Sequence, residues 1–178
     1  SVYGTQLGIM NEEKSLTRPI SPYGVTKLAA ENLTNLYHQN YGIPTMALRY
    51  FTVYGPRQRP DMAFTRFLYS IIKNEEFSIY GDGEQTRDFV FVDDVASANL
   101  LTCGLSNYST YVVGTGVETS VIQLVKLLEM ILSCDIDRSY SPLPKGDAIS
   151  SCSDISRLKN IGWEISTDIY EGLRTTLN

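Results

Sequence analysis

Residues 21–42, SPYGVTKLAAENLTNLYHQNYG, and residues 45–51, TMALRYF, decide the fold class of this chain. The first segment predicts a helix over residues 22–41, because Ser21 suits an N-cap and Gly42 suits a helix end. Its apolar side chains also recur at helical spacing, namely Leu28, Ala29, Leu33 and Leu36. The second segment is short and mostly apolar, as is typical of a strand in a buried parallel sheet. A helix followed directly by such a strand indicates an α/β fold.

The rest of the sequence continues to alternate between the two kinds of element. After a strand end and a loop in residues 1–20, further strands are expected at 77–80, 87–92 and 110–113. Helices are expected at about 62–74, from the Asp93–Asp94 pair to about residue 104, and from Thr119 or Ser120 to about residue 132. Two shorter helices are expected at 154–160 and 167–177. Residues 53–60 should form a loop and Gly114–Gly116 a tight turn, while Asp93 and Asp94 should cap a helix. This alternation favours a sheet with helices on its faces.

Composition narrows the class of protein. The chain has 178 residues, of which 43% are hydrophobic and 20% charged, so it can bury one sizeable core. No apolar run approaches the roughly 20 residues that span a bilayer. The net charge of −5 argues against nonspecific nucleic-acid binding. Several cations still gather in loops, where they could hold an anionic ligand or simply face solvent: Arg57, Arg59, Arg66, Arg87 and Lys145.

Other conspicuous side chains are interpreted as ordinary structure. Cys103, Cys134 and Cys152 are odd in number and form no CxxC pair, which indicates free thiols in a reducing compartment and no metal site. His38 is interpreted as a surface histidine and Trp163 as a packing residue. An apolar stripe at helical spacing indicates core: Phe64, Phe67, Leu68, Ile71 and Ile72.

Tyr23 and Lys27 are the strongest candidates for chemistry. Four residues apart on a helix, they lie on one face, one turn apart. A free tyrosine has a pKa of about 10 and is a poor base at neutral pH. An adjacent ammonium favours the phenolate and would lower that pKa, which makes the phenol a usable proton acceptor. The same spacing also occurs by chance on solvated helices, so the pair alone leaves both interpretations open.

Several motifs together resemble the nucleotide-sugar epimerases of the extended short-chain dehydrogenase/reductase family. They are Ser1–Gly4, Ser21–Lys27, Leu48–Pro56, Gly81–Phe89 with Val92–Val95, Val113–Gly116 and Lys145–Asp147, in the family's order. The resemblance implies the C-terminal portion of a Rossmann-type parallel sheet plus a small α/β substrate-binding subdomain. Residues 1–55 would end the NAD-binding domain and 56–178 would mainly bind the sugar nucleotide, with 88–116 returning to the Rossmann sheet. The family's dinucleotide-binding glycine motif would precede residue 1, since no GxGxxG occurs in this sequence.

The resemblance also implies a mechanism, that of an isomerase of carbohydrate metabolism. Tyr23 would remove the proton of the sugar 4-hydroxyl while hydride passes from C4 to NAD, and hydride would return to the opposite face of the 4-keto sugar. Lys27 would lower the pKa of Tyr23 and hydrogen-bond the nicotinamide ribose. Phe51 would contact the nicotinamide end of the cofactor.

The family positions around the substrate suggest a UDP-sugar. Thr52 and Arg59 resemble the residues that hold the sugar carboxylate in UDP-glucuronate 4-epimerases, a role that suits a forked guanidinium. Arg59 could equally be a loop cation in an enzyme for UDP-glucose or UDP-galactose. The uracil, diphosphate and ribose contacts would involve Tyr80, Arg87 and Asp147, with Lys145 beside them. Dehydratases and decarboxylases of the family usually carry Glu where this chain has Ser1, which favours an epimerase.

Two functions from different classes remain open at this point. The chain could be part of a cytoplasmic, NAD-dependent epimerase that is inactive as 178 residues alone. Alternatively it could be a non-catalytic module for nucleotide-sugar binding or association, or part of a related dehydratase or reductase. In the family the Tyr23 helix packs between subunits, so a homodimer through this helix is expected.

Overall fold

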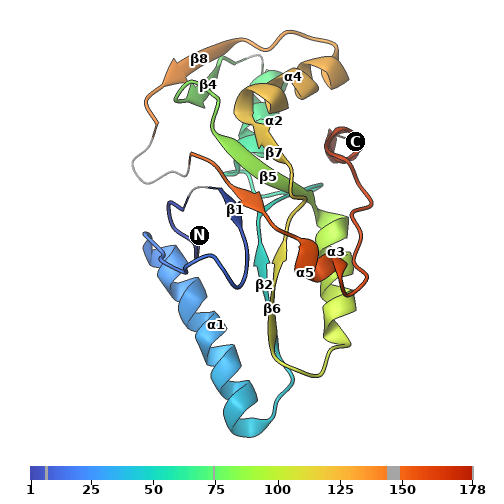
Figure 1. Cartoon of the computed structure of the whole chain (residues 1–178). Coiled ribbons are helices and arrows are strands. Elements are labelled where there is room, and N and C mark those ends of the chain that lie inside the picture. Colours follow the sequence, from blue (N-terminus) through green and yellow to red (C-terminus); the bar gives the residue numbers. More distant parts are fainter. Residues whose placement is uncertain (7, 74, 144–148, 178) are drawn as a thin grey trace.

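In the computed structural model, residues 1–6, 8–73, 75–143 and 149–177 are described. The helices are α1 (Pro22–Tyr41), α2 (Ala63–Lys73), α3 (Val92–Cys103), α4 (Val121–Leu132), α5 (Ser156–Lys159) and α6 (Ile169–Leu177). The strands are β1 (Ile9–Met10), β2 (Met46–Tyr50), β3 (Thr52–Tyr54), β4 (Phe77–Tyr80), β5 (Thr86–Phe91), β6 (Ser109–Val113), β7 (Glu118–Ser120), β8 (Arg138–Ser141) and β9 (Cys152–Ser153). This mixed order confirms the α/β class (Figure 1). Within the described ranges, no helix is long and apolar enough to cross a membrane.

Helix α1 forms as its sequence predicts. The Ser21 side chain caps it by accepting the Gly24 backbone N–H at 3.1 Å. Pro22, which lacks an N–H, fits the first turn. Gly42 ends the helix in the left-handed conformation at φ 65°, and its N–H donates to the His38 carbonyl at 2.9 Å. Local chemistry at both ends therefore fixes the bounds of the helix that carries Tyr23.

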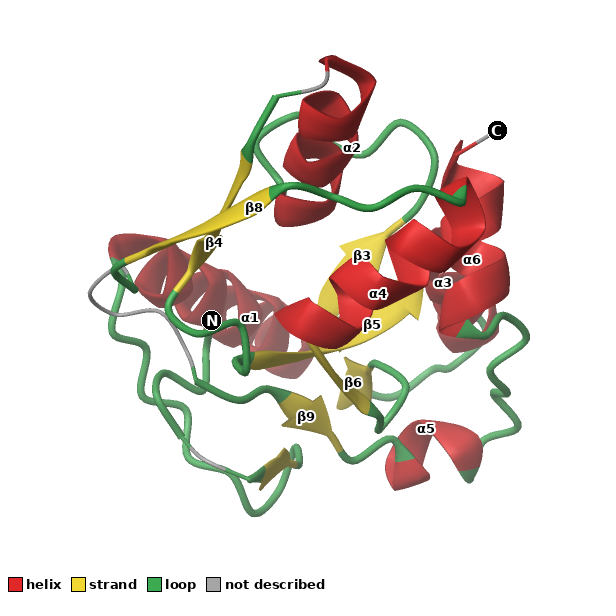
Figure 2. Ribbon diagram, turned by 90° about the horizontal axis from the view of Figure 1, so that it is seen from above, coloured by secondary structure: helices red, strands yellow, loops and turns green. Residues whose placement is uncertain are grey.

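Parallel pairing dominates the sheets. Strands β2 and β6 pair in parallel, as do β3 with β5, β4 with β8 and β1 with β9, whereas β5 and β7 are antiparallel. Helices α1 and α3 lie on opposite sides of the β2–β6 pair (Figure 1). Seen from above, α4 and α6 lie next to each other and close to β5 (Figure 2). The arrangement matches the expectation of helices on the faces of a sheet.

Two apolar cores meet at β5. Phe91 packs in one core with Tyr54 and the buried faces of α2, α4 and α6. Val90 packs in the other core with Trp163. Val90 and Phe91 are therefore both buried, although they are adjacent in the sequence. The alternation of buried and exposed residues expected along 87–92 is wrong at these two positions. The reason is that helices and loops cover both sides of this strand.

The interpretations of the ordinary residues are mostly confirmed. Phe64, Phe67 and Trp163 are buried, with Leu68 and Ile71 packed against the first core, while the side chain of Ile72 is outside the described set. The cysteines are free, two of them exposed and Cys152 buried. His38 is partly exposed, with Nδ1 2.9 Å from the Ile43 carbonyl oxygen.

Two expectations are wrong, and one strand was not expected. The segment expected to be a loop from residue 53 begins within β3, because Thr52 and its neighbours pair with β5. The polar strand β8 has no apolar pattern and owes its conformation to pairing with β4. The aspartate pair does not cap α3, whose N-cap is Phe91 and makes no side-chain cap hydrogen bond. Asp94 is instead buried, and its carboxylate accepts the backbone N–H groups of Ser166 and Thr167 at 2.9 and 3.3 Å.

Candidate active site

Tyr23 and Lys27 share one exposed face of α1. The Lys27 Nζ lies 5.4 Å from the centre of the Tyr23 ring, and 62% of the Tyr23 side chain is exposed. The prediction that the two groups meet on one helical face is confirmed. An ammonium this close to an aromatic ring is held by cation–π attraction, and a solvent-facing phenol can reach a ligand. The pair is thus accessible for proton transfer.

Gly24 explains how the start of α1 is placed. It is the buried residue of this helix. A methyl group there would come within 2.8 Å of the Ser1 carbonyl oxygen and 2.9 Å of the Pro19 Cβ. Only a residue without Cβ allows the first turn to approach the N-terminal segment this closely. The glycine between Ser21 and Lys27 therefore sets the position of the neighbouring tyrosine.

Arg59 lies on the loop near this pair and already has a partner. Its Nε and its second terminal nitrogen donate to the two Asp61 oxygens at 3.0 and 2.6 Å. The hydrogen bond and charge of Asp61 raise the pKa of Arg59, with a smaller contribution from the Tyr23 phenol. Asp61 in turn has its pKa lowered by Arg59. The guanidinium predicted for a sugar carboxylate is therefore engaged by a carboxylate of its own loop.

Phe51 and Thr52 follow directly after β2, at its carboxyl end. Phe51 packs against the small core of Val2 and Tyr3, and its N–H donates to the Val113 carbonyl at 2.9 Å. Thr52 begins β3 opposite Phe89. Both residues sit where strand ends of an open α/β sheet commonly face a ligand.

The predicted nucleotide contacts lie on other elements. Tyr80 ends β4, where its hydroxyl accepts from an Arg66 terminal nitrogen at 3.4 Å and its ring lies 5.6 Å from the guanidinium carbon. Arg87 lies on β5, and one of its nitrogens donates to the Thr86 carbonyl at 2.8 Å. Asp147 and Lys145 lie outside the described residues. The contact between Arg66 and Tyr80 was not predicted, because the sequence indicated Arg66 only as one of several clustered cations.

Sequence reasoning missed the buried carboxylate of Asp88. This side chain is 0% exposed. It accepts the backbone N–H groups of Thr115, Gly116 and Ser153 and also the hydroxyls of Thr115 and Ser153. A charged residue within the apolar strand RDFVF was the available signal, because a buried charge requires dedicated partners.

The pair Glu31 and Arg49 was missed as well. They form a forked ion pair between α1 and β2, with side chains only 13% and 11% exposed. Glu31 follows Lys27 by one further helical turn, so the continued spacing of Tyr23, Lys27 and Glu31 was a signal in the sequence.

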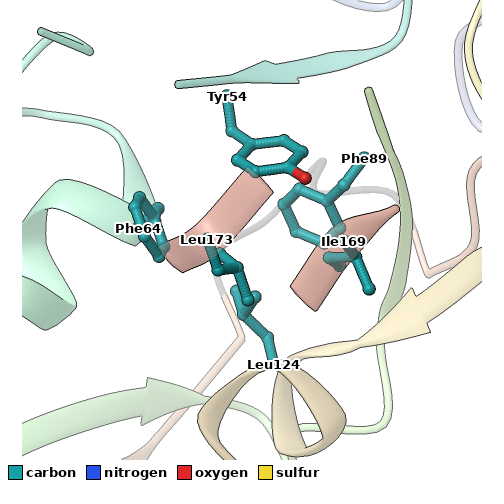
Figure 3. Close-up of a pocket in the computed structure, with 6 residues that line it drawn as sticks. All are labelled: Tyr54, Phe64, Phe89, Leu124, Ile169 and Leu173. Carbon is teal, nitrogen blue, oxygen red and sulfur yellow. The ribbon is translucent and has the colours of Figure 1, made fainter. Parts of the chain in front are cut away.

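Two hollows formed by the described residues lie elsewhere. The first, shown in Figure 3, is apolar and has no room for a water molecule; it is lined by Tyr54, Phe64, Phe89, Leu124, Ile169 and Leu173. It belongs to the first core, where burial and then the charges of Asp168 and Asp94 raise the pKa of Tyr54. A more polar hollow of about 340 Å³ lies between β2 and α3 and includes Asn99. Neither hollow is lined by Tyr23 or Lys27, so the candidate pair faces open solvent here.

Comparisons with known proteins agree with the motifs. Residues 1–114 match the NAD dependent epimerase/dehydratase family. The chain is 37% identical over its whole length to a UDP-glucuronate 4-epimerase of Thermodesulfobacterium geofontis, covering 56% of that protein. It is 39% identical to an uncharacterized UDP-glucose epimerase of Bacillus subtilis, over 97% of this chain and 55% of the relative. The chain therefore spans little more than half the length of these curated relatives.

The solved structures show the same relationship. A UDP-glucuronic acid 4-epimerase from Bacillus cereus, in complex with UDP-glucuronic acid and NAD, superposes with a TM-score of 0.92 at 35% identity. That superposition covers 99% of this chain and 57% of the other. A UDP-glucose 4-epimerase from Thermotoga maritima gives 0.92 at 39% identity, over 98% and 58%. The chain belongs to the NAD dependent epimerase/dehydratase family.

Proposed function

We propose that these 178 residues are part of an NAD-dependent nucleotide-sugar 4-epimerase that acts on UDP-glucuronate or on UDP-glucose and UDP-galactose. The observation that carries the proposal is the exposed Tyr23 phenol with the Lys27 ammonium 5.4 Å from its ring centre. The names of the relatives support the substrate class.

In this proposal Tyr23 accepts the proton of the sugar 4-hydroxyl and later returns one. Lys27 supplies positive charge beside the phenolate and donates hydrogen bonds toward a ribose. An exposed phenol and ammonium one turn apart fit a ligand that carries hydroxyl groups. NAD, when bound, supplies the hydride acceptor and donor at C4 of the sugar.

The substrate would be held by Thr52, Arg59, Tyr80, Arg87 and Asp147. For a glucuronate, the sugar carboxylate must replace Asp61 as the partner of Arg59. Both ends of that ion pair are largely exposed, at 75% and 64%, so the exchange is inexpensive. Asp61 therefore orients the Arg59 guanidinium when no substrate is bound, and the sugar carboxylate would take its place.

We also propose that residues 1–55 and the returning segment 88–116 form one unit, and that 56–178 otherwise form the sugar-nucleotide unit. Pairing of β2 with β6 supports this division, because it joins the two parts of the first unit. A homodimer through α1 is supported by its exposed apolar side chains, which include Val25, Leu33, Leu36 and Tyr37.

The competing function is a non-catalytic module for nucleotide-sugar binding or association. One observation favours it: Tyr23 and Lys27 line neither of the two hollows described above. For this reason we expect the 178-residue chain alone to turn over no UDP-sugar with added NAD.

The experiment uses a hybrid in which the N-terminal part of the Thermodesulfobacterium geofontis relative precedes residue 1. We expect the hybrid to bind NAD and to epimerise a UDP-sugar, and Tyr23→Phe to abolish turnover while NAD binding persists. A hybrid that binds both ligands without turnover favours the non-catalytic module. Arg59→Ala should weaken binding of UDP-glucuronate more than of UDP-glucose, and equal losses would remove the carboxylate role.

A further inference from the structure

Tyr23, Lys27 and Glu31 follow one another at four-residue intervals along α1. Lys27 therefore has a phenol one turn before it and a carboxylate one turn after it. Its flexible side chain can reach either neighbour, yet the ammonium lies over the Tyr23 ring. The arrangement raises the question of what keeps Lys27 away from Glu31.

Arg49 occupies the Glu31 carboxylate completely. Its Nε donates to one oxygen at 3.0 Å and a terminal nitrogen donates to the other at 2.6 Å. Both side chains are nearly buried, at 11% and 13% exposure. A forked pair of this kind uses both carboxylate oxygens in a fixed plane.

Arg49 is itself held rigidly. It lies on β2 opposite Val112 of β6, so paired strands fix its backbone. Its other terminal nitrogen donates to the Tyr3 hydroxyl at 2.8 Å, and its guanidinium carbon lies 5.0 Å from the Tyr3 ring centre. The guanidinium therefore cannot turn away from Glu31 without losing these contacts.

Without Arg49, Glu31 would keep a largely buried charge and have no other side-chain partner among the described residues. Such a carboxylate recruits the nearest available cation, because leaving it unpaired is costly. On α1 that cation is Lys27, one turn away. The ammonium would then leave the Tyr23 ring.

We propose that Arg49 is a positioning residue that sequesters the Glu31 carboxylate and thereby keeps the Lys27 ammonium on Tyr23. Its catalytic meaning rests on the proposed function, but the placement of Lys27 can be measured without any activity. Arg59 also interacts electrostatically with Tyr23, but it lies on a different loop, is paired with Asp61 and stays unchanged in the test.

The test records carbon–proton NMR spectra of the 178-residue chain carrying ¹³C-labelled lysine. Six lysines give six groups of side-chain signals. The Lys27 Hε signal, assigned with Lys27→Arg, should show the ring-current shift of a proton above an aromatic ring, and Tyr23→Leu should abolish that shift. Lys73, whose Nζ lies 5.9 Å from the Tyr69 ring centre on α2, is an internal control.

The expected pattern separates sequestration from simple structural support. Arg49→Met should move the Lys27 signal to its position in Tyr23→Leu, whereas Glu31→Gln should leave it in place. The double variant Glu31→Gln/Arg49→Met should restore it, because no carboxylate remains to attract Lys27. The Lys73 signal should stay fixed in every variant.

Two results would overturn the proposal. One is an unmoved Lys27 signal in folded Arg49→Met, and the other is a double variant that fails to restore the signal. If Arg49→Met does not fold by circular dichroism, Arg49→Lys replaces it, since a point charge cannot hold both oxygens. A smaller movement in the same direction is then expected, and no movement contradicts the inference. If the hybrid without substitutions shows no turnover although its Lys27 ammonium lies over Tyr23, the result would count against the proposed function and not against the positioning role of Arg49.

Discussion

Replacing the buried carboxylate of Asp88 by an amide should destabilise the protein strongly. One Asp88 oxygen accepts the Thr115 N–H and hydroxyl, both at 2.7 Å. The other accepts the N–H groups of Gly116 and Ser153, both at 3.0 Å, and the Ser153 hydroxyl. Through these bonds β5 holds the turn after β6 and strand β9.

The size of the effect follows from the geometry. In Asp88→Asn the amide oxygen should face Gly116 and Ser153, because two backbone donors meet there. Its NH₂ group then faces the Thr115 N–H, which cannot rotate away. An orphaned buried donor costs about 1–3 kcal/mol, and the remaining bonds lose their charge assistance. The expected loss in free energy of unfolding is therefore about 2–4 kcal/mol.

Urea unfolding followed by circular dichroism measures this loss. With a slope of about 2 kcal/mol per molar urea, the midpoint should fall by about 1–2 M. The matched control is Glu118→Gln, because its hydrogen-bond donors among the described residues are the rotatable hydroxyls of Thr86 and Ser150. The control should stay within about 0.5 kcal/mol of the parent. A loss below about 1 kcal/mol in Asp88→Asn, or one equal to the control, would refute the argument.

Three further expectations concern the surface. Leu33→Asp on the exposed face of α1 should reduce self-association in light scattering, whereas Leu100→Asp on α3 should not; a strictly monomeric parent chain would contradict the proposed dimer. Hydrogen bonds, chiefly from Ser156, lower the pKa of Asp154 below its ordinary 3.8, so their stabilisation is present above that value and lost as the pH falls through the lower folded-state pKa. Acid unfolding of Asp154→Asn should therefore be less steep below pH ~4, and an unchanged acid limb would show that the bonds contribute nothing. Iodoacetamide should alkylate the two exposed cysteines before Cys152, because burial raises the pKa of the Cys152 thiol, and mass spectrometry of early time points would expose the reverse order.

Local patterns in the sequence predicted α1 well. Ser21, Pro22 and Gly42 act on residues within about one helical turn of their own positions, so their effect can be predicted from the local sequence. The same holds for α4, where Ser120 and Gln123 form a capping box. Tyr23 and Lys27 could be placed on one face for the same reason, since helical spacing alone brings them together.

Features that depend on distant partners could not be predicted in this way. Strand β8 has no apolar pattern and is ordered by pairing with β4. Asp94 looked like a helix cap, but its partners lie about 70 residues later, at Ser166 and Thr167. Arg59 was predicted either to hold a sugar carboxylate or to be a loop cation, and its ion pair with Asp61, only two residues later, was not predicted. In each case the partner of a polar group cannot be predicted from the hydrophobic periodicity of the sequence.

These polar contacts divide into two kinds with different consequences. Asp88 and Asp94 tie the C-terminal segments to the two cores, so their loss should weaken the whole fold. The Glu31–Arg49 pair instead attaches α1, a helix whose outward face is exposed and which buries little apolar surface of its own. Removing both charges of a buried pair is often tolerated, while removing one is not. The double variant at this pair should therefore keep both the fold and the Tyr23 site, and only the single loss of Arg49 should disturb the site. Stability would then depend mainly on Asp88 and Asp94, whereas the geometry of the Tyr23 site would depend on Glu31. This separation requires that α1 is oriented by the Glu31–Arg49 ion pair and not by apolar packing.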